Sequence, residues 1–189
     1  MKMIDKTIGS AGKSFEKLLN EILIPAFDNP FLAKKGDGAV LPPMNGRIVF
    51  STDAHIVSPL FFKGGNIGKL AFCGTVNDVA MMGAVPKYLT MSFIIEEGFE
   101  LKLLETIVES IAELSKQFKI PVVSGDTKVV EKGKGDGIFI TCSGIGEIVN
   151  PSVSLLPENI PVGADIILSG SIGEHGVAVM SAHDAYSFD

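Results

Sequence analysis

Apolar residues along this chain follow two periods, one typical of helices and the other of strands. The segments with helical spacing are 15–24, 67–82 and 101–118. The strand-like runs are 47–58, 87–95, 120–124 and 138–149. Between 40 and 150 the predicted order is therefore β-α-β-α-β-β, which indicates an α/β (α+β mixed) domain whose sheet is covered by helices. A glycine- and lysine-rich hairpin predicted at 132–137 would make that sheet mixed rather than wholly parallel.

The two ends of the chain are predicted to lie outside this central domain. Residues 1–36 hold a glycine-rich segment and the first helix, for which Ser14 is the predicted N-cap and Pro25 the predicted end. Residues 37–150 form the central domain, beginning in loops around a short element at 38–41. Residues 151–189 read as a linker and the beginning of a second domain. Its predicted elements are a strand at 165–168, a glycine-rich turn at 170–176 and a helix at 177–183. Because one strand and one helix cannot bury a core, we expect the chain to be the front part of a longer protein.

The segment 68–86 is apolar almost all the way round, yet it carries Asn77 and Asp78 in its middle. An ionised carboxylate among apolar neighbours costs several kcal/mol unless a cation or hydrogen-bond donors compensate it. Asp78 therefore either caps something internal or faces a site that receives positive charge.

Composition excludes several classes of function. The net charge of −6, with Arg47 as the sole arginine, argues against nucleic-acid binding. Two cysteines and three histidines without a CxxC motif make a zinc site improbable, so Cys73 and Cys142 are expected to be buried reduced thiols. The sequence shows neither a signal-peptide pattern nor an apolar run of transmembrane length. We therefore expect a cytoplasmic protein that does not associate with a membrane.

A glycine-rich segment at 9–14 resembles a phosphate-binding loop only in part. The P-loop pattern requires glycine where this chain has Thr7, and no strand precedes the segment. Two interpretations stay open: a mobile segment that folds over phosphates through Gly9, Ser10 and Gly12, or a disordered tail.

Four aspartates recur among small residues: Asp37, Asp53, Asp78 and Asp126. Each alone fits a structural role, such as a turn for Asp37. If the four converge, their repulsion requires a divalent cation, and oxygen ligands favour Mg²⁺. Substrate phosphates usually complete such a Mg²⁺ shell, and Lys128 follows Asp126 on the same strand face. The set therefore predicts a Mg-nucleotide site, with Asn77 and Thr127 beside the aspartates.

Several of these motifs resemble the HypE family of hydrogenase maturation proteins. The matching runs are 51–53, 58–62, 64–70, 73–84, 125–130, 134–138 and 170–176. The aspartate motifs are shared with a wider superfamily that includes aminoimidazole ribonucleotide (AIR) synthetase, selenophosphate synthetase and thiamine-monophosphate kinase. The runs Pro-Leu-Phe-Phe at 59–62 and Gly-Asp-Thr-Lys-Val-Val at 125–130 favour HypE.

This resemblance implies a PurM-like ATP-binding domain of a carbamoyl dehydratase. Such an enzyme phosphorylates and dehydrates a thiocarboxamide on its own C-terminal cysteine, giving a thiocyanate for the cyanide ligands of NiFe hydrogenase. It implies that the four aspartates hold Mg-ATP, that Lys128 and Asp78 act in catalysis, and that Gly9–Gly12 fold over the phosphates. It also implies a homodimer and HypF and HypC–HypD as partners.

The resemblance has one departure and leaves two alternatives. The family's reactive cysteine lies on a C-terminal tail, and Cys73 and Cys142 do not match it, so this chain is not expected to complete the reaction alone. One alternative is another enzyme of the superfamily, a small-molecule kinase or synthetase. The other is a non-catalytic dimerisation or docking module.

Overall fold

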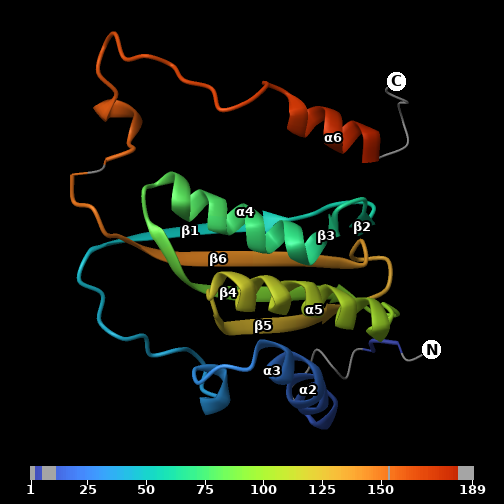
Figure 1. Cartoon of the computed structure of the whole chain (residues 1–189). Helices are drawn as coiled ribbons and strands as arrows, with labels where there is room; N and C mark the ends of the chain where they lie inside the picture. The colour runs from blue at the N-terminus through green and yellow to red at the C-terminus, as the bar shows by residue number, and fades with distance from the viewer. Residues whose placement is uncertain (1–2, 6–11, 153, 183–189) are drawn as a thin grey trace.

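A four-stranded mixed sheet forms the centre of the molecule in the computed structural model, which describes residues 3–5, 12–152 and 154–182 (Figure 1). The sheet consists of β1 (Arg47–His55), β4 (Val85–Glu96), β5 (Val122–Val130) and β6 (Ile138–Ile148), in the spatial order β1-β6-β4-β5. β6 is antiparallel to both β1 and β4, whereas β4 and β5 are parallel. The predicted mixed α/β sheet is therefore confirmed, with β1 and β5 as its edges.

The predicted hairpin between the last two strands is wrong. β5 and β6 lie on opposite sides of β4, and the loop between them passes around the end of β4. Glu96 at that end holds the loop: its carboxylate accepts hydrogen bonds from the N–H groups of Gly133 and Gly137. These two bonds lower the pKa of the Glu96 carboxyl. The sheet is mixed because β4 and β5 run parallel, whereas β6 runs antiparallel to both β1 and β4.

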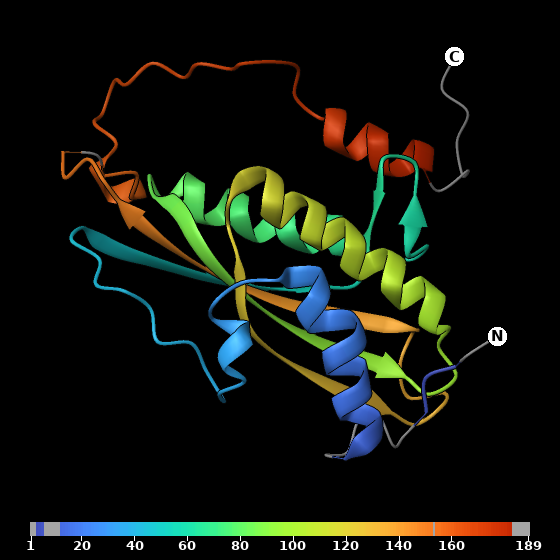
Figure 2. The same ribbon diagram turned by 60° about the horizontal axis from the view of Figure 1, so that its bottom comes forward.

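Two helices, α4 (Ile67–Met81) and α5 (Leu101–Phe118), cover one face of the sheet (Figure 2). α4 begins at Asn66, whose side chain accepts hydrogen bonds from the N–H groups of Gly68 and Lys69. The inward side chains of β4 and α5 meet in the core, which includes Leu89, Met91, Phe93, Ile95, Leu104, Ile107, Val108 and Ile111. Two short strands, β2 (Phe61–Phe62) and β3 (Gly65–Asn66), lead into α4.

The open face of the sheet carries alternate residues that point away from the helices. Ile48 and Phe50 of β1 are 63% and 64% exposed, and Ile94 of β4 is 39% exposed. Thr52 and Ser143 share a 2.8 Å hydrogen bond on this face. The sequence predicted a sheet covered by helices; in the described part of the chain, helices cover one face only.

α4 lies close to β6 because two glycines face it. A β-carbon at Gly146 would lie 2.3 Å from Val79 Cγ1 and 3.0 Å from the Val85 carbonyl oxygen. At Gly144 the nearest atoms would be those of Val79 and Thr75, at 2.9 and 3.0 Å.

We expect Gly146→Ala to destabilise the domain, because overpacking a tight helix–sheet contact costs about 1–3 kcal/mol. Urea unfolding followed by circular dichroism measures the change. Gly170→Ala is the control, since nothing lies within 4 Å of a β-carbon there. Equal midpoints for the two variants would show that α4 can shift without cost.

The first helix is longer than predicted. It runs through α2 (Lys13–Leu18), a π-helical turn η1 (Leu19–Leu23) and α3 (Ile24–Phe27), so Pro25 does not end it. Proline lacks an N–H and its ring crowds the preceding turn, and the wider π turn lies directly before it. The N-cap is Gly12 rather than Ser14. A 3₁₀ turn η2 (Leu32–Lys34) follows, and residues 38–41 form no regular element.

The C-terminal segment contributes nothing to this core. Described residues from 149 to 181 are exposed, including the 3₁₀ turn η3 (Pro157–Asn159) and helix α6 (Glu174–Ala182). The predicted strand at 165–168 does not form, because a strand needs a pairing partner and the described residues offer it none. Ile166 and Ile167 are 92% and 89% exposed.

Candidate functional site

A first acidic group lies between edge strand β1 and helix α4. Period-two alternation turns Ser51, Asp53 and His55 toward the helix, where Asp78 is exposed. The Ser51 hydroxyl donates a 3.3 Å hydrogen bond to the Asp78 carboxylate. Gly74 of α4 admits the His55 ring, because a β-carbon there would lie 3.0 Å from His55 Cε1. Two of the four aspartates predicted to bind Mg²⁺, Asp53 and Asp78, therefore lie near each other, and their binding of the cation stays a prediction.

Two buried polar atoms of this group have no hydrogen-bond partner among the described residues: Asp53 Oδ2 and His55 Nε2. An unsatisfied buried carboxylate oxygen is costly, and a second carboxylate nearby adds repulsion. Burial lowers the pKa of the His55 imidazole, while Asp53 and Asp78 act in the opposite direction. Hard oxygen donors that lack partners fit Mg²⁺, so the residues present suit the predicted cation.

His55 belongs to this group because it follows Asp53 by two residues on β1, and residues two apart on a strand share a face.

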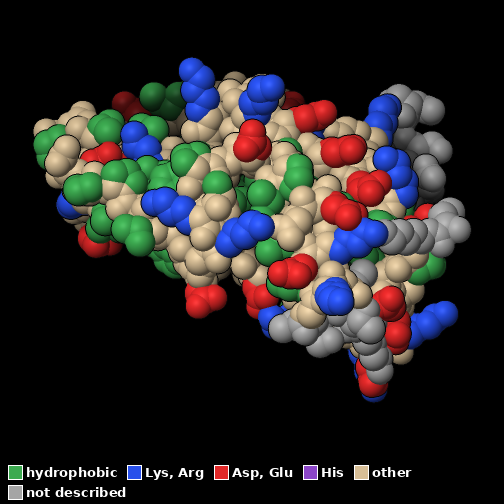
Figure 3. All heavy atoms as spheres, turned by 90° about the horizontal axis from the view of Figure 1, so that it is seen from below, with side chains coloured by type: hydrophobic (Ala, Val, Ile, Leu, Met, Phe, Trp, Pro, Cys, Tyr) green, Lys and Arg blue, Asp and Glu red, His purple; other side chains and the backbone are tan. Residues whose placement is uncertain are grey.

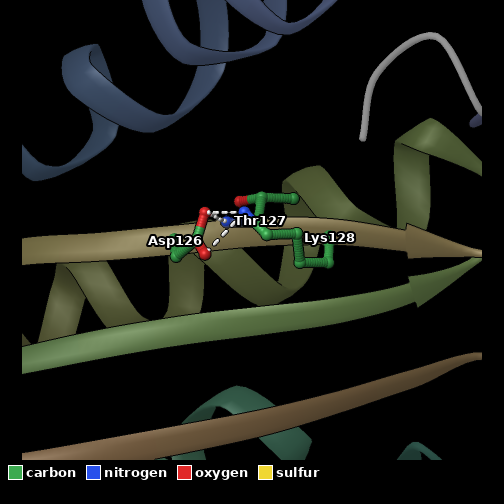
Figure 4. A network of polar contacts seen from close by, with 3 residues as sticks. All are labelled: Asp126, Thr127 and Lys128. Carbon is green, nitrogen blue, oxygen red and sulfur yellow. Dashed lines mark hydrogen bonds and ion pairs between the residues drawn. The ribbon is translucent and has the colours of Figure 1, made fainter. Parts of the chain in front are cut away.

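A second group lies on the opposite edge strand, β5, at Asp126, Thr127 and Lys128 (Figure 4). Asp126 Oδ1 accepts hydrogen bonds from Lys128 Nζ at 2.7 Å and from the Thr127 N–H at 2.8 Å. These contacts lower the pKa of Asp126, the Lys128 bond contributing most. Asp126 and Lys128 point to the open face, whereas the Thr127 side chain is buried on the helix side. β5 continues to Val130, so Asp126 lies within the strand, not at its end as predicted.

A cavity of about 520 Å³ adjoins this second group. Its lining residues come from β4, β5, the N-terminal helical segment and the loop after α3. Asp37, Asp126 and Thr127 line it, so the structure brings together three residues predicted to bind the cofactor.

The four predicted aspartates do not converge within one chain. Asp53 and Asp78 lie at β1, and Asp126 lies at β5, three strand spacings or about 14 Å across the sheet. Among the described residues there is no cluster of three or more His, Cys, Asp or Glu side chains that could hold a metal ion. The described part of one chain therefore holds these residues in two separate groups.

The remaining predicted residues are placed as follows. Asn77 is exposed on α4 beside Asp78, and Gly12 is the exposed N-cap of α2. Gly9 and Ser10 lie outside the described residues.

Both cysteines are free thiols as predicted, but only Cys142 is buried as predicted, and neither suits a nucleophile. Burial raises the pKa of Cys142 to about 11 and raises that of the half-buried Cys73. At neutral pH both stay protonated.

Acidic and basic side chains lie interspersed on the face shown in Figure 3, without a basic stripe. Within the described part of the chain, every helix is too short or too polar to cross a bilayer.

Comparison with known proteins connects this geometry to one family. Residues 35–148 match the N-terminal domain of AIR synthase related proteins. The carbamoyl dehydratase HypE of Cupriavidus necator is 49% identical over 98% of this chain and 53% of its own length. The Escherichia coli HypE is 40% identical over 57% of its length. The chain thus spans about half the length of the curated relatives it matches.

Solved structures agree with the sequence matches. HypE in complex with ATP has a TM-score of 0.82 at 39% identity, covering 98% of this chain and 55% of that one. A HypE–HypF complex gives 0.70 at 50% identity, covering 91% and 55%. These likenesses agree with the PurM-like domain expected from the motifs.

Proposed function

Because this chain belongs to the AIR synthase related family and is homologous to the N-terminal part of HypE proteins, we propose that it binds Mg-ATP for a carbamoyl dehydratase of hydrogenase maturation. The observation that carries this proposal is the pair of unsatisfied atoms beside Asp78, where a cation would relieve Asp53 Oδ2. The likeness to a HypE–ATP complex supports the nucleotide.

In this proposal the acidic residues would bind the cation, and the basic residue Lys128 would bind the phosphoryl group. Asp53 and Asp78 would hold Mg²⁺, which would neutralise phosphate oxygens, and Asp37 and Asp126 would contribute from the second group. Lys128 carries the positive charge suited to the transferred phosphoryl group, and Asp126 holds its ammonium in place. Gly9, Ser10 and Gly12 remain proposed phosphate contacts.

In the proposed reaction, the amide oxygen of the carboxamide bonds to the γ-phosphorus and ADP leaves. Loss of the amide protons and of inorganic phosphate then leaves the nitrile. Phosphoryl transfer of this kind depends on positioning and charge neutralisation more than on covalent chemistry by the protein. The acceptor would be a cysteine other than Cys73 and Cys142, since these are half-buried and buried thiols.

A homodimer would complete the site. The open sheet face carries exposed Ile48, Phe50 and Ile94, which a second copy would bury. A two-fold axis along the strands would place β1 of one subunit over β5 of the other. The Asp53–Asp78 group of one chain would then lie beside the Asp126–Lys128 group of its partner. HypF and a HypC–HypD complex are the further partners that we propose, and the HypE–HypF complex supports the first.

Calorimetry with the 189-residue chain tests this proposal. We expect ATP to bind in the presence of Mg²⁺, and chelation of Mg²⁺ to weaken binding at least about tenfold, because two or more carboxylates then repel the phosphates. Absence of binding at millimolar nucleotide would favour the docking-module alternative. Turnover of thiamine phosphate by the full-length protein would instead favour a superfamily kinase.

A further inference from the structure

We propose that the ammonium group of Lys128 occupies the cation position at Asp126 before the nucleotide binds, and that it leaves this position when Mg-ATP arrives. This inference rests on the proposed function, in which Asp126 has two partners, Mg²⁺ and Lys128. It adds the order in which Asp126 binds them. Lys128 then becomes free for the phosphoryl group only in the presence of the Mg-nucleotide.

The contacts of the Asp126 carboxylate leave little room for a second cation (Figure 4). Lys128 Nζ lies 2.7 Å from Oδ1 and 2.7 Å from Oδ2, so it engages both carboxylate oxygens. The Thr127 N–H donates a third contact, at 2.8 Å to Oδ1. A carboxylate has about four lone-pair sites, and Mg²⁺ requires near-octahedral geometry. A divalent ion bound here would share a single negative charge with an adjacent ammonium, and this repulsion favours the release of Lys128.

The two side chains of the ion pair differ in how firmly they are held. The Thr127 N–H fixes the Asp126 carboxylate, and the Thr127 side chain is only 4% exposed, so β5 is anchored in the core at this point. The Lys128 side chain is 63% exposed, and its ammonium ends a flexible four-carbon stem. Because exposed ion pairs contribute little to stability, a doubly charged ion can replace the ammonium without disturbing the strand. Lys128 can therefore move while Asp126 stays in place.

The ion pair also has a role in the proposed dimer before the nucleotide binds. Asp126 would then lie beside the partner's Asp53 and Asp78, and like charges at close range repel. Lys128 neutralises Asp126 under these conditions. When Mg-ATP binds, its phosphates offer the released ammonium a new anionic partner. The ammonium is therefore available to the reacting groups only after the nucleotide has bound.

Binding of Mn²⁺ without nucleotide tests this exchange, because Mn²⁺ takes the same oxygen ligands as Mg²⁺ and its free form is measured by electron paramagnetic resonance. We expect Lys128→Met to bind Mn²⁺ about fivefold more tightly than the wild type, the equivalent of one exposed ion pair that no longer has to be broken. The same variant should bind ATP about tenfold more weakly at fixed Mg²⁺, because a charged donor to the phosphates is lost. These opposite signs distinguish the exchange from general damage to the site.

Two controls show whether the gain in Mn²⁺ affinity comes from Asp126. Lys134→Met removes the same charge from an exposed lysine in the loop after β5, and it should bind Mn²⁺ as the wild type does. In the Asp126→Asn background, Lys128→Met should give no gain, because the carboxylate that the ammonium would release is absent.

Each outcome has one meaning. The exchange is overturned if Lys128→Met binds Mn²⁺ no more tightly than the wild type, if Lys134→Met gains as much, or if the gain persists in the Asp126→Asn background. Failure of the wild type to bind Mg-ATP in calorimetry would instead overturn the proposed function. Circular dichroism confirms that each variant is folded, and Lys128→Gln serves if Lys128→Met is not.

Discussion

Replacing Asp78 with asparagine should weaken Mg-dependent ATP binding by about a hundredfold and leave the fold intact. Loss of even an indirect metal contact commonly costs 10–100-fold in metal affinity, so loss of a carboxylate ligand should reach the upper end. The substitution preserves size and removes one negative charge beside Asp53. Titration calorimetry at fixed Mg²⁺ measures the change.

Stability should not change in this variant, for reasons visible in the structure. Asp78 is exposed, and among the described residues its carboxylate accepts one long hydrogen bond, at 3.3 Å from the Ser51 hydroxyl, which asparagine can also accept. Glu109→Gln on the exposed side of α5 removes the same charge far from β1 and should alter neither property. If Asp78→Asn lowers the urea midpoint and leaves nucleotide affinity unchanged, Asp78 is a structural residue.

Mixing two inactive variants should restore nucleotide binding. The acidic groups lie on opposite edges of the sheet, so a shared cation site requires β1 of one subunit and β5 of another. Asp78→Asn and Asp126→Asn homodimers should each lack both sites. A mixed dimer would contain one site with both substitutions and one site with neither.

Tandem affinity purification of differently tagged copies isolates this mixed dimer, and calorimetry gives its stoichiometry. We expect two ATP per wild-type dimer and one per mixed dimer. Subunit exchange cannot create false binding, because both parental homodimers are inactive. A mixed dimer that binds no ATP would show that each site uses a single chain, and a monomeric wild type in sedimentation would remove the premise.

Much of the fold was predictable because hydrophobic periodicity is a local property. The predicted helix at 101–118 coincides with α5, and the predicted strands at 47–58, 87–95 and 138–149 lie at β1, β4 and β6. The motifs also indicated the family, which the comparisons support. The predictions were wrong at two places where tertiary packing overrides the local sequence signal. Pro25 lies inside the first helix, which forms a wider π-helical turn just before it. The apolar run at 165–168 forms no strand, because no described strand pairs with it.

The candidate site was predictable as a set of residues but not as an arrangement. All four aspartates were expected to share one cation, and of these Asp53 and Asp78 both lie near His55. Asp126 was expected to lie with them, but the strand order places it on β5, at the edge of the sheet opposite β1. Its position along β5 also directs its side chain to the open face, whereas Asp53 faces the helices. The cavity beside it left no sequence signal, since its lining residues come from separate segments.

The sequence by itself determined the type of most elements, the acidic chemistry of the site and the family, because each depends on residue type and short spacing. Only the tertiary structure decided that β5 and β6 flank β4. This strand order also divides the acidic residues into two separate groups. Strand pairing is chosen by long-range burial and hydrogen bonding across the whole sheet. A turn-like sequence such as 132–137 fixes where the chain bends, but not which strands it joins.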